Sequence, residues 1–102
     1  MPTLHTVNKS PYERNALKSC LDHVSSGDCI LLIEDGVLGA RKGGSFAPSL
    51  TEMKTSCAIY ALGPDLAARG LTKDDLAEGV ELVDYAGFVD LAAAATRVCA
   101  WL

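Results

Sequence analysis

The sequence predicts a small α/β domain with a mostly parallel sheet of four to five strands and helices on both faces. Short apolar runs alternate with helical patterns along the chain, which is typical of β-α-β units. The run CILLIE at 29–34 is almost continuously apolar, as expected for a strand that is covered on both faces. A length of 102 residues fits one domain, and no linker interrupts it. We therefore expect a single domain over 1–102.

The first elements are a strand and an amphipathic helix. The run TLHTV at 3–7 reads as the first strand. Ser10, Pro11 and Glu13 form a strong helix start: serine caps, proline fits the first helical position, and glutamate bonds back to the cap. The helix is expected to end at the polar Ser25-Ser26-Gly27. Its apolar face carries Leu17, Leu21 and Val24.

The rest of the chain continues the alternation of strands and helices. Glycine and proline mark the boundaries between segments. Ala-rich segments are predicted as helices, and segments rich in β-branched residues are predicted as strands. The expected elements are a strand at 29–34, a helical stretch at 37–41, a mobile loop at 42–48, a helical turn at 50–55, a strand at 57–62, a helix around 66–69, a partly helical segment at 70–79, a strand at 80–84, a helix at 85–95 and a final strand at 97–102.

Composition excludes several classes of protein. A net charge of −4 argues against a nucleic-acid-binding surface, which needs clustered Lys and Arg. The N-terminal segment lacks the features of a secretory signal, and no apolar run approaches the roughly 20 residues of a membrane span. The expected location is the cytoplasm, where the four cysteines are expected as reduced thiols.

No cofactor or metal site is expected. The glycines at 36–44 match neither nucleotide-binding fingerprint. No C-x-x-C pair exists, and His5 and His23 show no ligand spacing.

Cys20 is the candidate for chemistry, as a catalytic thiol. It is expected at the border of the helical apolar face, where a partner can reach it, and His23 three residues on can approach the sulfur and favour the thiolate. The alternative is that Cys20 is a small apolar residue at a helix–sheet border. Cys29, Cys57 and Cys99 lie in apolar runs and are expected in the core.

The C-terminal residues predict association. Trp101 and Leu102 are large and apolar, where a free chain end is usually polar. Either the final strand is internal to the sheet or this end docks on another subunit. We therefore expect an oligomer.

Several segments together resemble one known family. The segments LHTVNKSP, LLIEDGV, YALGPDLAARGL, VDYAGFVDL and AWL are similar to those of the DsrH/TusB family, over nearly the whole chain. The resemblance implies a DsrE-like fold and a cytoplasmic heterohexamer with DsrE-like and DsrF-like subunits. It also implies relay of persulfide sulfur to a DsrC/TusE-like acceptor protein, with no direct contact with nucleic acid or membrane.

The family has two branches. TusB-type proteins serve 2-thiolation of tRNA wobble uridine and need no cysteine in the first helix, whereas DsrH-type proteins of dissimilatory sulfur oxidation carry one there. Cys20 therefore favours the DsrH type and a DsrEFH-like complex. The family's principal sulfur-carrying cysteine lies on the DsrE/TusD-type subunit, which leaves Cys20 as a secondary acceptor. A TusB-like subunit and a non-catalytic structural subunit are the alternatives.

Overall fold

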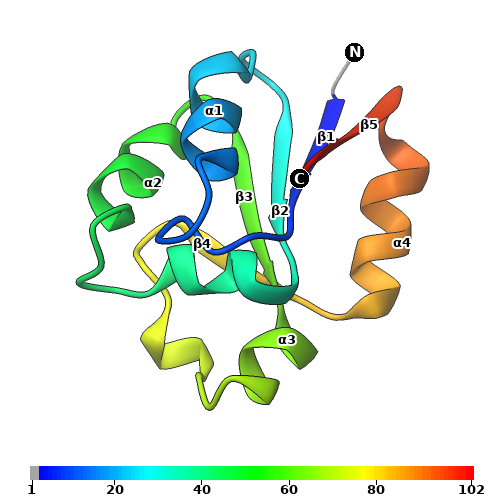
Figure 1. Cartoon of the computed structure of the whole chain (residues 1–102). Helices are drawn as coiled ribbons and strands as arrows, with labels where there is room; N and C mark the ends of the chain where they lie inside the picture. Colours follow the sequence, from blue (N-terminus) through cyan, green and yellow to red (C-terminus); the bar gives the residue numbers. More distant parts are fainter. Residues whose placement is uncertain (1–2) are drawn as a thin grey trace.

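Five parallel strands form one sheet in the order β4-β3-β2-β1-β5 (Figure 1). The computed structural model describes residues 3–102, and the fold class expected from the sequence is confirmed. β1 is therefore internal, and β4 and β5 are the two edges. The strands are β1 Thr3–Val7, β2 Cys29–Leu32, β3 Ala58–Leu62, β4 Val80–Val83 and β5 Arg97–Trp101.

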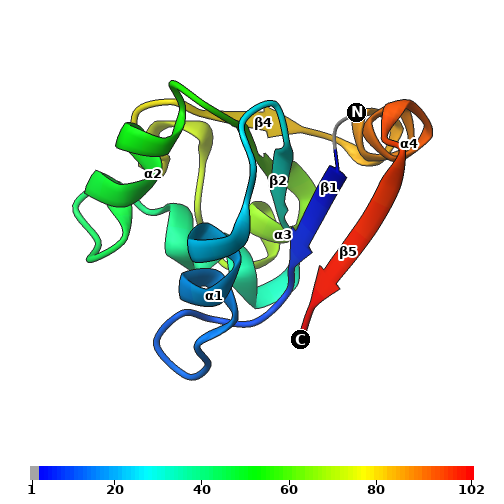
Figure 2. The same ribbon diagram turned by 90° about the horizontal axis from the view of Figure 1, so that it is seen from above.

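Helices lie on both faces of the sheet. Figure 2 shows α1 and α2 together on one face and α4 on the other. This division follows from the order of the strands. The chain runs from β1 through β2 and β3 to β4 and then returns across the sheet to β5, on the other side of β1. Because crossovers between parallel strands are right-handed, the helices of the outward path and the helix of the return path lie on opposite faces. The helices are α1 Ala16–His23, η1 Glu34–Ala40 (3₁₀), α2 Ala47–Met53, α3 Gly63–Ala68, η2 Lys73–Asp75 (3₁₀) and α4 Tyr85–Ala94.

The main core lies between the sheet and the face that α1 covers. Alternate strand residues point to this side, and the register aligns Val7 of β1 with Leu32 of β2. Trp101 of β5 is the other neighbour of Val7 and packs against the edge of the core. The buried core residues are Val7, Ala16, Leu17, Cys20, Ile30, Leu32, Val37, Ala40, Leu50, Ile59, Ala61 and Leu66.

The 3₁₀ helix η1 presses directly on the carboxyl end of β1. A Cβ atom added to Gly36 would collide with the backbone carbonyl of Val7, so only glycine fits there. Glu34 enters this turn with φ +49°, a left-handed conformation that is uncommon outside glycine. Its backbone N–H donates to Asp65 Oδ2 at 2.6 Å, which ties the turn to α3.

Most predicted elements are present, with shifts at their ends. The strands at 3–7, 29–34, 57–62, 80–84 and 97–102 all occur, some of them shortened. The helix expected at 50–55 begins earlier, at Ala47, with Pro48 in its first turn. It therefore takes the end of the segment expected to be a loop.

The predicted helix start at Ser10 is wrong. Ser10 Oγ does accept from the N–H of Tyr12 at 3.2 Å, but the following residues form a turn and α1 begins only at Ala16. Pro11 lies against Gly39 of η1, so this segment packs on η1 before the helix starts. Cys20 is consequently in the second turn of α1.

Candidate functional site

Cys20 lies inside the subunit. Its exposed fraction is 0%, and it belongs to the core cluster with Ala16 and Leu17 of the same helix. The buried stripe of α1 therefore passes through Ala16, Leu17 and Cys20, while Leu21 is only partly buried. The expectation that a partner can reach Cys20 at the border of the helix is wrong for this structure.

The environment of Cys20 disfavours ionisation of its thiol. Burial is the main reason that its pKa rises from 9.0 to about 12, and the nearby thiols of Cys99 and Cys57 and the carboxylate of Asp28 raise it further. The thiolate is the form that attacks or accepts sulfur. At neutral pH Cys20 is therefore an uncharged apolar group.

His23 does not activate Cys20. Its Nδ1–H donates to the backbone carbonyl of Ser19 at 2.7 Å, and its ring lies 5.7 Å from the Trp101 ring, centroid to centroid. The imidazole is thus engaged by its own helix and by β5. The predicted lowering of the Cys20 pKa by His23 is wrong, because desolvation governs the sulfur.

The other cysteines divide into two kinds. Cys57 is buried, as expected, and its thiol donates to the backbone carbonyl of Ser25 at 3.4 Å. Cys29 and Cys99 are partly exposed, so the expectation of core positions holds only in part for them. All four are free thiols, and burial raises the pKa of Cys29 and of Cys57.

A hydrogen-bonded network joins the N-terminal strand to the C-terminal one. His5 of β1 is buried, and its Nε2–H donates to Asp28 Oδ2 at 2.8 Å. Trp101 Nε1–H donates to His5 Nδ1 at 3.0 Å. Because the indole can only donate, Nδ1 must accept, and the imidazole is the neutral Nε2–H tautomer.

Asp28 is held as a carboxylate. Burial alone raises its pKa, but hydrogen bonds from the backbone N–H groups of Ser25 and Thr3 and from the His5 side chain outweigh burial. The pKa falls from 3.8 to about 2. The network thus joins a buried carboxylate, a neutral imidazole and an indole.

The sequence pattern did not reveal this network. His5 lies in β1, Asp28 immediately precedes the neighbouring strand β2, and Trp101 reaches His5 only because β5 pairs with β1. A signal was present in His5 within the predicted strand TLHTV, since a histidine that is buried in a sheet needs hydrogen-bond partners. The identity of those partners needed the three-dimensional arrangement.

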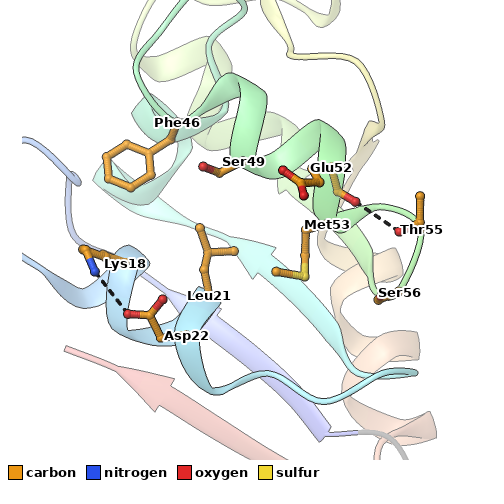
Figure 3. A pocket seen from close by; sticks show the side chains of 9 residues that line it. All are labelled: Lys18, Leu21, Asp22, Phe46, Ser49, Glu52, Met53, Thr55 and Ser56. Atoms are coloured by element: carbon orange, nitrogen blue, oxygen red, sulfur yellow. Dashed lines mark hydrogen bonds and ion pairs between the residues drawn. The ribbon is translucent and has the colours of Figure 1, made fainter.

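A groove of about 550 Å³ lies between α1 and α2 (Figure 3). Leu21, Phe46 and Met53 form its apolar part, and polar side chains surround them. Lys18 pairs with Asp22 at 3.2 Å along one edge. The groove therefore offers an apolar surface with a polar and charged rim. The lining residues are Lys18, Leu21, Asp22, Phe46, Ser49, Glu52, Met53, Thr55 and Ser56.

Over residues 3–102, no three or more His, Cys, Asp or Glu side chains are grouped so that they could hold a metal ion. Within the same residues, no helix has the length and apolar character needed to cross a membrane.

The sequence matches known proteins over almost its full length. The family model described as "DsrH like protein" matches residues 9–98. "Protein TusB" of Pectobacterium parmentieri is 37% identical over 98 residues, which cover 96% of this chain and 99% of that protein. "Protein TusB" of Escherichia coli strain K12 is also 37% identical, with the same coverage.

Solved structures show the same fold. The ychN protein of E. coli superposes with a TM-score of 0.81 at 16% identity, over 98% of this chain and 99% of that one. Protein Tm0979 of Thermotoga maritima superposes with a TM-score of 0.63 at 29% identity, over 89% and 91%. With the family match and the 37% identical relatives, these findings show that the chain belongs to the DsrH/TusB family.

Proposed function

We propose that this chain is a subunit of a cytoplasmic sulfur-relay complex and that its role there is structural. In this proposal the sulfur-carrying cysteine lies on a DsrE/TusD-type partner, in a heterohexamer that also contains a DsrF/TusC-type subunit and delivers sulfur to a DsrC/TusE-like acceptor. Membership of the DsrH/TusB family supports the assignment to such a complex. The burial of Cys20, with a thiol pKa of about 12, supports the structural role.

Mass spectrometry of the assembled complex tests this role. The complex is incubated with a persulfide donor, and the intact mass of each subunit is measured. We expect added sulfur on the partner subunit and none on this chain, and we expect Cys20→Ala to leave sulfur transfer unchanged. Cys99→Ala, at a partly exposed thiol, is the matched control. Sulfur bound at Cys20 within the complex would refute the structural role and restore Cys20 as an acceptor.

The pathway we favour is 2-thiolation of tRNA wobble uridine. The relatives named TusB, 37% identical over 98 residues, support this choice. In the sequence, Cys20 favours the DsrH branch, because the resemblance implies a cysteine in the first helix of that branch. In the structure Cys20 fills part of the core between α1 and the sheet. Packing alone therefore explains the presence of this cysteine, and it is weak support for the DsrH branch over the TusB branch.

Dissimilatory sulfur oxidation in a DsrEFH-like complex is the second candidate, and the presence of Cys20 in α1 is the observation in its favour. Complementation separates the two. The chain is expressed in a strain that lacks its TusB-type protein, and the 2-thiouridine content of tRNA is measured. We expect thiolation to be restored by the wild type and by Cys20→Ala. An unrestored strain, despite a stably expressed chain that assembles with the host partners, contradicts the tRNA pathway.

A further inference from the structure

Large apolar side chains are exposed around the junction where β4 leads into α4. Leu82 is 44% exposed, Tyr85 59% and Val89 66%. Tyr85 and Val89 are four residues apart and therefore share a helix face. None of the residues of α4 is buried, although the helix carries only one charge, Asp90. A helix of this composition normally buries most of its surface, so the outer face of this one lacks a partner in the isolated subunit.

A hollow of about 400 Å³ adjoins these residues at the carboxyl end of β4. It lies between the first turns of α3 and α4, and Leu82, Val83 and Gly87 line it together with Gly63 and Asp84. Gly63 and Gly87 carry no side chains that could fill it. The hollow can accept an apolar side chain from outside next to the exposed Tyr85.

The charges around this surface have one sign. Between residues 74 and 96 the sequence contains six Asp and Glu and no Lys or Arg. Glu78 pairs with Lys54, the residue that follows α2, at 3.4 Å, whereas no ion pair reaches Glu81, Asp84 or Asp90 within residues 3–102. These three exposed carboxylates therefore have no ion-pair partner among residues 3–102. Glu81 and Leu82 are consecutive in β4 and point to opposite faces of the sheet, whereas Asp84 caps α4 and Asp90 lies within it. We name Leu82, Tyr85, Val89, Asp84 and Asp90 the β4–α4 patch.

We infer that the β4–α4 patch docks a partner subunit of the relay complex whose contacting face is apolar and flanked by Lys and Arg. This inference rests on the proposed function. Complementary charges neutralise the carboxylates and fix the register of the contact, while the apolar side chains supply the buried area. A second copy of this chain is a poor occupant, because a twofold contact through the patch brings the same carboxylates face to face.

Binding of this chain to the DsrE/TusD-type and DsrF/TusC-type subunits of the proposed complex tests the inference. Tyr85→Ser removes an apolar contact, and Asp90→Lys reverses a charge of the patch. We expect each to weaken binding about tenfold or more, and we expect salt to weaken the wild type more than Asp90→Lys. The matched controls are Tyr12→Ser and Glu13→Lys, exposed residues before α1, and we expect them to bind like the wild type. Circular dichroism and the Tm confirm that each variant is folded.

The outcomes separate the inference from the proposed function. If the wild type assembles and both patch variants bind as tightly as their controls, the docking surface is elsewhere and the inference is overturned while the proposed function stands. If the wild type alone forms a dimer that Tyr85→Ser dissociates, a second copy occupies the patch, which also overturns it. If no partner subunit binds the wild type, the proposed function itself fails.

Discussion

The indole N–H of Trp101 donates to Nδ1 of His5 at 3.0 Å, so one hydrogen bond links the two ends of the described chain. It lies between neighbouring parallel strands and orients the imidazole toward Asp28. The sequence predicts either that the final strand is internal to the sheet or that this end of the chain docks on another subunit. Instead β5 is an edge strand, and Trp101 packs within its own subunit, while Leu102 is 81% exposed.

The bond between Trp101 and His5 predicts the effect of two substitutions. Trp101→Phe keeps an aromatic ring but leaves Nδ1 of a buried histidine without a donor, so we expect the free energy of unfolding to fall by about 1–2 kcal/mol. Trp101→Ala also removes packing and should cost about 2–4 kcal/mol. Urea unfolding measures both. Leu102→Ala is the control, with an expected change of less than about 0.5 kcal/mol. Equal stability of Trp101→Phe and wild type contradicts the role assigned to this bond.

The carboxylate of Asp28 predicts a dependence of stability on pH. Its pKa in the folded state, about 2, is below its ordinary 3.8, so folding favours the carboxylate. This contribution is complete above about pH 4 and is lost as the pH falls toward 2. Thermal unfolding between pH 2 and 6 should show this loss in the wild type. Asp28→Asn should be less stable at pH 6 and should show a flatter profile, and parallel profiles would contradict the prediction.

The burial of Cys20 predicts slow thiol modification. In the native protein we expect iodoacetamide to label Cys29 and Cys99, which are partly exposed, before Cys20. Cys20 should react at the rate of an exposed thiol only after unfolding. Because its pKa is raised to about 12, stability should also fall as the pH rises above about 9, and Cys20→Ala should reduce that fall. Peptide mass mapping identifies the labelled sites, and rapid labelling of native Cys20 contradicts its burial.

The close approach of η1 to β1 predicts that substitution of Gly36 by any residue with a side chain is destabilising. Gly36→Ala places a methyl group against the carbonyl of Val7, so we expect the free energy of unfolding to fall by about 1–3 kcal/mol or more. The control is Gly44→Ala, in the loop before α2, where the nearest atoms are 3.0 Å away or more and include the end of the Tyr12 side chain. Chemical denaturation compares the two, and similar losses contradict the steric argument.

The fold was predictable from the sequence because its strands are short, apolar and separated by glycine, proline or polar residues. The pattern placed β1 at the correct residues and α4 within one residue of its end. The start of α1 was missed for a local reason. A serine followed by proline satisfies the rules for a capped turn as well as those for a helix, and only the contact of Pro11 with Gly39 decides between them.

The accessibility of Cys20 was not predictable from its own helix. A helical projection centred on Leu17 and Leu21 places Cys20 at the border of the apolar face. In the structure β5 packs against the side of α1 that carries Cys20, and Trp101 of β5 lies beside His23. The buried face of α1 is therefore centred closer to Cys20 than the helical projection predicts. The strand that covers the thiol comes from the other end of the sequence. Leu21 is left partly exposed in the groove toward α2.

The pairing of β1 with β5 has a consequence for how the polypeptide folds. Val7 lies beside Trp101, so the pairing of β1 with β5 closes a loop of nearly the whole chain. The entropic cost of closing this loop arises before the strand contacts that offset it have formed. The strands from β1 to β4 can form earlier through shorter crossovers. Docking of β5 is then expected as the last and slowest event, and until it occurs the buried imidazole of His5 and one edge of β1 remain open to water and to chaperones.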